Sequence, residues 1–256
     1  ALVGDDYETA PLQVVDRTPG QNECGMVVFF FSLKTPECPN GREFILIGND
    51  ITHNSGSFGV VEDMVFYRAS EIARAKGIPR LYVAANSGAR IGLASEVMQA
   101  FHVQWKDDSD PSLGYEYLYL TPDQFKVLQS AVIASETTHT DGSVRYVIHD
   151  IVGMKNDIGV ECLSGSGRIA GETARAYQEI PTMTFVSARS VGIGAYLVRL
   201  GQRTIQKVSG PIILTGAPAL NKLLGREVYT SNAQLGGTQI MYHNGVSHWT
   251  VTNDLK

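Results

Sequence analysis

The chain has 256 residues, 43% of them hydrophobic and 18% charged, which is long enough for one large α/β domain or two small ones. Its formal charge of −5 and its lack of a dense basic run argue against binding to nucleic acid or to a membrane surface. The three cysteines lack a Cys-x-x-Cys spacing, which argues against a disulfide framework or a zinc site and favours a reducing compartment. The longest apolar run, Met26 to Phe31, is too short to span a bilayer, and no signal peptide is recognisable.

The first third of the chain predicts alternating strands and helices. Residues 1–23 are polar and are expected to form a loose lead-in. A helix is predicted over 61–76, because apolar residues recur there at steps of three and four, and Gly77-Ile78-Pro79 should end it. A shorter helix is expected after Gly92. The predicted strands are Met26–Leu33, which we expect to be buried, Phe44–Asn49 and Leu81–Ala85.

The middle of the chain is less regular. Residues 105–111 are rich in aspartate and predict a solvated loop. Tyr115, Tyr117 and Tyr119 then alternate in a way that is typical of an edge strand. Residues 137–142 predict the tip of a hairpin before a strand over Arg145–Val152.

The last third returns to alternating elements. Strands are predicted over Thr182–Ser187, Thr204–Val208 and Ile212–Thr215, with helices over Ala195–Leu200 and Pro218–Leu224. Strands that alternate with helices indicate an α/β fold. The strand–glycine–helix unit recurs loosely about every 100 residues.

A glycine-rich segment, Gly165–Gly171, has a spacing that would suit a dinucleotide-binding turn. The residues before it do not form a convincing buried strand, so the favoured interpretation is a structural turn that opens a helix over Ile169–Tyr177.

Two other glycine-rich turns are the most informative part of the sequence. Ala84–Gly92 and Arg189–Tyr196 each follow a predicted strand and lead into a predicted helix. Glycine allows a sharp turn and close approach to a ligand, and the first amides of the following helix are free to donate. The pair of turns therefore predicts a site built from backbone donors, suited to an oxyanion rather than to a metal.

Other catalytic patterns are absent from the sequence. Neither Ser87 nor Ser166 has the glycines of a Gly-x-Ser-x-Gly elbow. The six histidines show no metal-ligand spacing, and no Walker pattern occurs.

Arg189 ends a predicted strand just before a glycine turn, where it could bind a carboxylate or phosphate. A salt bridge to a nearby acid explains it equally well. For Arg90, surface pairing is the better explanation. Tyr196 and Leu163 could line a pocket or pack in the core.

Long stretches of the sequence resemble the carboxyltransferase domain of eukaryotic, multidomain acetyl-CoA carboxylase, from about residue 24 to the end. The matching segments are 48–52, 56–59, 84–92, Gly114–Thr121, Gly159–Gly171, Val191–Arg203, Ile212–Gly225, Arg226–Met241 and Asn244–His248.

The resemblance implies a crotonase fold, in which ββα units wind into a superhelix, with residues 24–256 forming the N-terminal of two similar subdomains. It implies transfer of carboxyl from carboxybiotin, held on a separate carrier domain, to acetyl-CoA, giving malonyl-CoA for fatty-acid synthesis. The biotin itself then provides the base. The expected partners are a C-terminal carboxyltransferase half, missing after Lys256, and a second copy in a homodimer. ATP and metal are expected only at another domain, and the location is expected to be cytoplasmic, with a plastid as the alternative.

By resemblance, the backbone N–H groups of Ala89 and Ile193 form the oxyanion hole, and the glycines 88, 192 and 194 shape it. Arg189 and Ser87 are expected to contact the CoA substrate, and Tyr196 and Leu163 to form pocket walls. No metal ligand is expected. The isolated chain should be inactive or nearly so. A propionyl-CoA-type carboxyltransferase and a noncatalytic interaction module of the same fold remain alternatives.

Overall fold

The computed structural model describes residues 1–2, 10–18, 20–91, 94–151 and 163–254. By their internal contacts, these residues divide into two compact units: residues 1–90 with 162–256 form unit 1, and residues 91–161 form unit 2. The expected boundary between a lead-in over 1–23 and a single subdomain over 24–256 stays a prediction.

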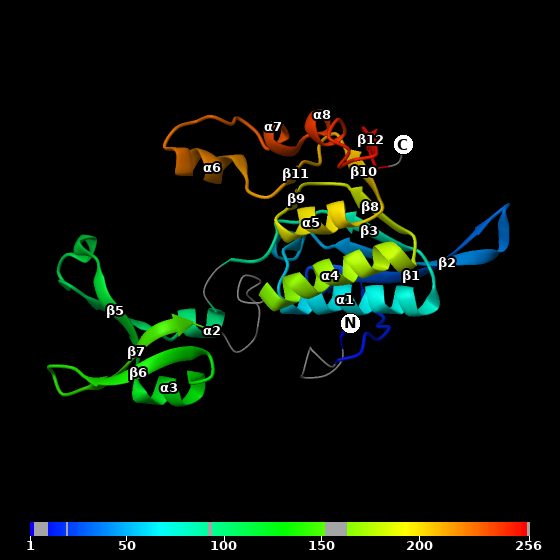
Figure 1. Cartoon of the computed structure of the whole chain (residues 1–256). Coiled ribbons are helices and arrows are strands. Elements are labelled where there is room, and N and C mark those ends of the chain that lie inside the picture. Colours follow the sequence, from blue (N-terminus) through cyan, green and yellow to red (C-terminus); the bar gives the residue numbers. More distant parts are fainter. Residues whose placement is uncertain (3–9, 19, 92–93, 152–162, 255–256) are drawn as a thin grey trace. The chain divides into compact units, whose positions relative to one another are not determined.

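Unit 1 is built around a mainly parallel sheet with the order β1-β2-β3-β8-β10-β12, and a second, small sheet pairs β9 with β11 (Figure 1). Its strands are β1 (Met26–Thr35), β2 (Cys38–Asn49), β3 (Arg80–Ala84), β8 (Thr182–Val186), β9 (Ser190–Val191), β10 (Arg203–Lys207), β11 (Ile212–Ile213) and β12 (Trp249–Val251). Its helices are α1 (Val60–Lys76), α4 (Leu163–Glu179), α5 (Ile193–Leu200), α6 (Ala217–Leu224), α7 (Ala233–Gly236) and α8 (Thr238–Met241), with a 3-10 turn at Asn54–Gly56.

Two consecutive ββα units stack on one another in unit 1. The first is β8, β9 and α5, and the second is β10, β11 and α6. Each unit adds one parallel strand to the large sheet, where β8 pairs with β10, and one to the small sheet, where β9 pairs with β11. This repetition is the architecture that the sequence led us to expect.

Helices α1 and α4 lie side by side along the sheet (Figure 1). The side chains of Phe66 and Tyr82 are fully buried between sheet and helices, with ring centroids 5.4 Å apart in an edge-to-face arrangement. Burial of each such side chain stabilises the fold by about 1.5–3 kcal/mol. The predicted end of α1 is confirmed: Gly77 is left-handed (φ 64°), and the N–H groups of Gly77 and Ile78 close the helix on Arg74 and Ala73.

A buried polar cluster fastens α1 to α4. The guanidinium of Arg74 donates to both carboxylate oxygens of the buried Glu172, at 2.7 and 3.0 Å, and Ser70 donates to the same carboxylate at 2.9 Å. The buried Arg80 donates to Ser70 in turn, at 2.7 Å. Glu172 thus has the ion pair and the hydrogen bonds that a buried carboxylate requires.

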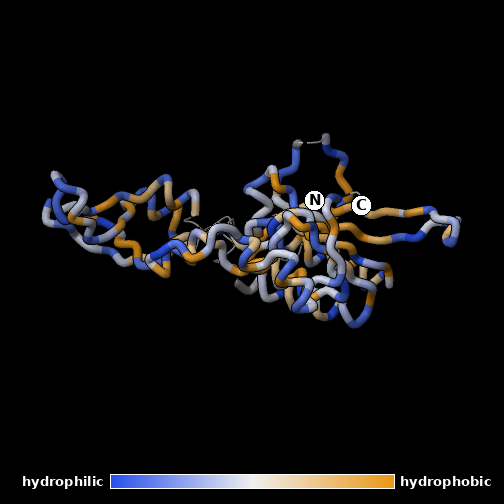
Figure 2. The backbone as a smooth tube through the Cα atoms, turned by 90° about the horizontal axis from the view of Figure 1, so that it is seen from above, coloured by the Kyte–Doolittle hydropathy of each residue, from blue (hydrophilic) through white to orange (hydrophobic). Residues whose placement is uncertain are grey.

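Three sequence expectations are wrong in unit 1 and unit 2. The strand at 26–33 is buried only at Met26: β1 is an edge strand whose residues Phe29–Leu33 are exposed, in a hairpin that is apolar along its strands and polar at its tip (Figure 2). Residues 165–171 do not form a turn, because α4 already begins at Leu163 and contains them. The strand that contains Tyr115, Tyr117 and Tyr119 has a neighbour on each side at Tyr119.

Unit 2 contains an antiparallel sheet with the order β4-β5-β7-β6 around its own small core, in which Val97 and Leu120 are fully buried. Tyr115, Tyr117 and Tyr119 belong to β5, which pairs with β4 along its length and with β7 at Tyr119 and Leu120, so only the part of the strand with Tyr115 and Tyr117 has a single neighbour. The hairpin of β6 and β7 confirms the predicted tip. The elements of unit 2 are α2 (Ser95–Met98), β4 (His102–Trp105), a 3-10 turn at Pro111–Leu113, β5 (Tyr115–Leu120), α3 (Pro122–Leu128), β6 (Val132–Thr138) and β7 (Val144–Ile151).

Candidate oxyanion site

The two glycine turns follow neighbouring strands of unit 1. Strands β3 and β8 are parallel and paired, with Ala84 opposite Val186, so both chains leave the sheet at the same edge. One turn follows β3 through residues 84–90, and the other follows β8 and passes through β9 into α5. The parallel sheet therefore brings together two segments that lie about 100 residues apart in sequence.

The two turns touch at their glycines. A Cβ placed on Gly88 (φ +79°) would lie 3.1 Å from the carbonyl oxygen of Val191, and one placed on Gly192 (φ +55°) would lie 3.9 Å from the Cα of Gly88. Both backbones are left-handed at these glycines, a conformation that strains other residues. Glycine is thus favoured at both positions by the turn shape, and at Gly88 also by the close approach.

The Ala89 amide is free on one side of its turn. On the other side, Phe58 N–H donates to Gly88 O, and Arg90 N–H donates to Phe58 O, both at 2.8 Å. This bridge uses the groups that flank Ala89 and directs its own N–H away from Phe58. Among the described residues, no acceptor lies within hydrogen-bond distance of the Ala89 N–H.

The Ile193 amide is the first of helix α5, whose N-cap is Gly192. The first amides of a helix have no partner within it and carry its positive dipole end. The N–H groups of Ala195 and Tyr196 turn back to Gly192 O, whereas that of Ile193 has no acceptor in the described part of the chain. Ala89 and Ile193 thus leave two backbone donors unused, on turns that are in contact.

Sequence reasoning missed Asn86. This side chain is 1% exposed, and its Oδ1 accepts the N–H groups of Gly88 at 3.2 Å and Val191 at 3.0 Å. Gly194 packs against it so closely that an added Cβ would lie 2.2 Å from Oδ1. Polarity at the end of a buried strand was the only local signal, and it did not reveal a partner more than 100 residues away.

Arg90 does not form a surface pair, contrary to expectation. Its guanidinium lies 2.7 Å from Glu62, whose carboxylate is only 1% exposed. Glu62 also accepts the N–H groups of Gly25 at 2.8 Å and Gly59 at 2.9 Å, so it ties the turn to the start of α1. The residue next to it, Asp63, is buried, and neither of its carboxyl oxygens has a hydrogen-bond partner in the part of the chain that the structure describes. Desolvation, helped by the charge of Glu62, raises the pKa of Asp63 from 3.8 to about 8.

Arg189 and Ser87 meet at the rim of the two turns. The Arg189 guanidinium donates to Ser87 Oγ at 2.8 Å, and Ser87 donates to the carbonyl of Ser55 at 3.1 Å. The alternative of a salt bridge to a local acid is not realised among the described residues. Arg189 is exposed, so its remaining donors are accessible to an anionic ligand.

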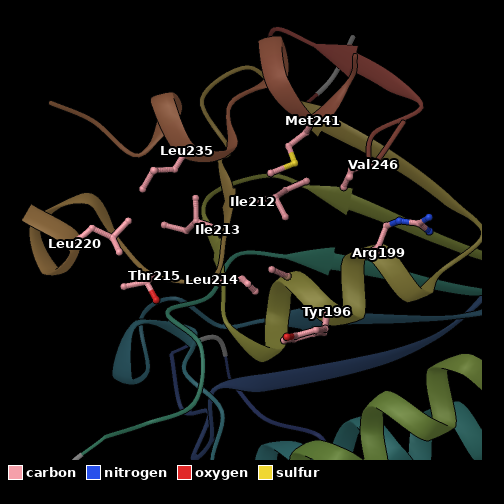
Figure 3. A pocket seen from close by; sticks show the side chains of 11 residues that line it. Tyr196, Arg199, Ile212, Ile213, Leu214, Thr215, Leu220, Leu235, Met241 and Val246 are labelled. Atoms are coloured by element: carbon pink, nitrogen blue, oxygen red, sulfur yellow. The ribbon is translucent and has the colours of Figure 1, made fainter. Parts of the chain in front are cut away.

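Tyr196 projects from α5 into the wall of an apolar cavity of about 530 Å³, and its side chain is 55% exposed (Figure 3). Ile212 and Ile213 of β11 and the following Leu214 form one wall, and α6, α7 and α8 contribute Leu220, Leu235 and Met241. Leu163 begins α4, but its side chain lies outside the described residues.

The described residues contain no cluster of three or more His, Cys, Asp or Glu side chains arranged to hold a metal ion. No helix in the described ranges has both the length and the hydropathy needed to span a membrane.

Comparisons with known proteins give a family. The family described as "Carboxyl transferase domain" matches residues 36–256. The chain is 56% identical over 252 residues to the acetyl-CoA carboxylase of Saccharomyces cerevisiae (strain ATCC 204508 / S288c), covering 97% of this chain and 11% of that protein. It is 54% identical over 257 residues to the acetyl-CoA carboxylase of Schizosaccharomyces pombe, covering 99% of this chain and 11% of that protein. It is also 54% identical, over 246 residues, to a protein of Saccharomyces cerevisiae (strain JAY291) named acetyl-CoA carboxylase, mitochondrial.

Among solved structures, transcarboxylase 12S with hydrolysed methylmalonyl-coenzyme A bound superposes with a TM-score of 0.56 at 15% identity, covering 90% of this chain and 31% of that one. This similarity confirms the predicted α/β crotonase fold. The chain spans only 11% of the length of the curated relatives described above. The family match covers most of the chain, so this protein belongs to the carboxyl transferase domain family.

Proposed function

We propose that this chain stabilises a thioester enolate, as the carboxyltransferase part of a biotin-dependent acetyl-CoA carboxylase that forms malonyl-CoA for fatty-acid synthesis. The observation that carries the proposal is the pair of unused amides, Ala89 N–H and Ile193 N–H, on two turns in contact. High identity to proteins named acetyl-CoA carboxylase supports the choice of substrate.

The amides act on the oxygen of the thioester. Removal of a methyl proton from an acyl-CoA moves negative charge onto that oxygen, and two fixed N–H donors stabilise the charge as it develops. Gly88, Gly192 and Gly194 allow the backbone to approach without side chains in the way. Donors held by the fold need no reorganisation during the reaction, which is why backbone amides suit this task.

The rim of the site binds the rest of the substrate. Arg189 keeps a guanidinium accessible beside Ser87 and is placed to bind an anionic part of coenzyme A. Tyr196 lines the apolar cavity beside α5, which would take a nonpolar group of the substrate. Leu163 is proposed as a further wall residue.

The residues present fit a cofactor that brings its own base. The turns 84–90 and 189–194 contain no Asp, Glu, His, Lys or Cys, so they offer no side chain to accept the methyl proton. When bound, carboxybiotin on a carrier domain would supply the carboxyl group and the base. The chain's own part is to hold the thioester oxygen and to position the acyl group.

The partners and the compartment belong to the same proposal. We expect a biotin carrier domain, a C-terminal carboxyltransferase half and a second copy of the chain in a dimer to complete the site. The location of the protein stays a prediction, cytoplasmic or in a plastid. The relatives do not share one compartment, since one of them is named as mitochondrial.

The decisive experiment removes one amide and leaves its helix intact. Ile193 is the first residue of α5, and proline is favoured at the first position of a helix, so Ile193→Pro deletes the N–H at a position where helices accept proline. The control, Ile193→Ala, removes the side chain and keeps the N–H. In the complete protein that carries this chain, we expect malonyl-CoA formation by the proline variant to fall about 10²–10³-fold below that of the alanine variant. Equal rates for the two variants would remove Ile193 from the oxyanion site.

The same assay separates the alternatives. Faster carboxylation of propionyl-CoA than of acetyl-CoA would assign the propionyl-CoA-type reaction. An inactive complete protein that still forms its dimer would indicate an interaction module. Arg189→Ser should raise KM for the acyl-CoA if Arg189 binds substrate, and unchanged KM and kcat would exclude that role.

A further inference from the structure

We propose that Asn86 is a positioning residue that holds the Ala89 and Ile193 amides in register on one substrate oxygen. The inference rests on the proposed function and extends it to a residue that does not touch substrate. The backbone N–H and the side-chain amide of Asn86 form hydrogen bonds with the two turns and with strands β2, β3 and β9.

The side-chain oxygen of Asn86, Oδ1, joins the two turns directly. It accepts the N–H of Gly88, the residue before Ala89, and the N–H of Val191, two residues before Ile193. The backbone N–H of Asn86 also donates to Arg189 O at 2.8 Å. Since one atom fixes a peptide group in each turn, any shift of this atom changes the distance between the two free amides.

The orientation of the side-chain amide follows from its partners. Backbone N–H groups can only donate, so the atom that meets Gly88 and Val191 must be the oxygen. The nitrogen then donates to Ser190 Oγ at 3.0 Å and lies 3.3 Å from the Tyr82 hydroxyl. With this orientation, each hydrogen bond of the Asn86 side-chain amide joins one donor to one acceptor.

Packing holds Asn86 in place from two sides. Gly194, on the first turn of α5, lies against the plane of its amide, where any side chain would collide. Beneath it, Asn49 Oδ1 accepts the Tyr82 hydroxyl at 2.7 Å and the Ala85 N–H at 3.2 Å. A buried amide with all its groups satisfied is rigid, which is the property required of a group that sets the geometry of an oxyanion site.

The matched control is Asn221 on α6. Its Oδ1 also accepts two backbone N–H groups, from Val228 and Tyr229, both at 2.9 Å, and its nitrogen donates to Tyr229 O at 2.7 Å. Asn86→Ala and Asn221→Ala therefore both remove a side-chain oxygen that accepts two backbone N–H groups. Only the first removes a link between the two turns.

The experiment uses the complete protein and two measurements. In steady-state carboxyl transfer, we expect Asn86→Ala to lower kcat about 10²–10³-fold with KM for the acyl-CoA within about threefold, and Asn221→Ala to leave both nearly unchanged. In amide hydrogen exchange, we expect Asn86→Ala to speed exchange in both turns, residues 84–90 and 189–194, whereas Asn221→Ala speeds it only near 226–229.

Two results would overturn the proposal: a kcat for Asn86→Ala that matches the Asn221→Ala value, or faster exchange in only one turn. Asn86→Ser is the second variant if Asn86→Ala does not fold. Failure of both to fold, while Asn221→Ala folds, would assign Asn86 a purely structural role. If the unmodified complete protein shows no carboxyl transfer, the proposed function fails, and hydrogen exchange alone then decides whether Asn86 holds the turns.

Discussion

The buried, unpartnered carboxyl of Asp63 should make unit 1 less stable as the pH rises. Its pKa is raised from 3.8 to about 8 in the folded chain, so the folded state keeps the proton at pH values where the unfolded chain has lost it. This contribution to stability is therefore fully present below pH 4 and is lost as the pH rises towards about 8.

The size of the effect follows from the shift. Each pKa unit corresponds to about 1.36 kcal/mol, so at about pH 7 Asp63 destabilises the fold by about 4 kcal/mol relative to about pH 4. Asp63→Asn replaces the carboxyl by a group of the same shape that does not ionise. The quantity to compare is the gain in free energy of unfolding of Asp63→Asn over the parent. We expect this gain to be larger at about pH 7 than at about pH 5, by about 2–3 kcal/mol.

The assay is urea denaturation followed by tryptophan fluorescence. The chain has two tryptophans, so Trp105→Phe in both proteins leaves Trp249, in β12 of unit 1, as the reporter. Glu43→Gln, an exposed carboxylate on β2 of the same unit, controls for the loss of one charge. Other titrating groups cancel in the difference between variant and parent. If that difference were the same at both pH values, the argument from burial would be refuted.

Two further predictions concern the packing of Gly194 and the burial of the Glu172 carboxylate. Gly194→Ala should abolish carboxyl transfer and lower Tm, because its Cβ would collide with the Asn86 amide, whereas Gly171→Ala, where a Cβ meets nothing within 4 Å, should stabilise α4 by about 0.5–1 kcal/mol. A stable, active Gly194→Ala protein would contradict this geometry. Glu172→Ala should destabilise unit 1 by about 3–5 kcal/mol in urea denaturation, and the half-exposed Glu179→Ala by less than about 1 kcal/mol. Equal losses for these two carboxylates would show that burial does not decide their contribution.

Patterns within short segments were sufficient for some of the regular elements. Helix α1 could be predicted because its apolar spacing and the Gly77 ending are local properties of the chain. The two glycine turns were visible for the same reason, since positive φ angles such as those of Gly88 (+79°) and Gly192 (+55°) favour glycine. The family resemblance then assigned the free amides, Ala89 and Ile193, which no local pattern identifies.

The errors arose where neighbours distant in sequence decide the structure. Alternating tyrosines fit an edge strand and an inner strand equally, and only the pairing of β5 with both β4 and β7 distinguishes the two. Gly165–Gly171 contain turn-forming residues, but they form a helix that packs on α1. An apolar run at 26–33 predicts burial, although β1 lies at the edge of its sheet.

The sequence by itself determined the α/β class, the position of the two turns and the need for glycine in them, because these depend on backbone sterics and on side-chain periodicity. Only the tertiary structure decided that Asn86 binds both turns, that Arg90 pairs with the buried Glu62, and that the carboxyl of Asp63 has no hydrogen-bond partner among the described residues. The first two are contacts between segments about 30 to 100 residues apart, and a contact of that kind exists only after the sheet has placed the ends of its strands side by side.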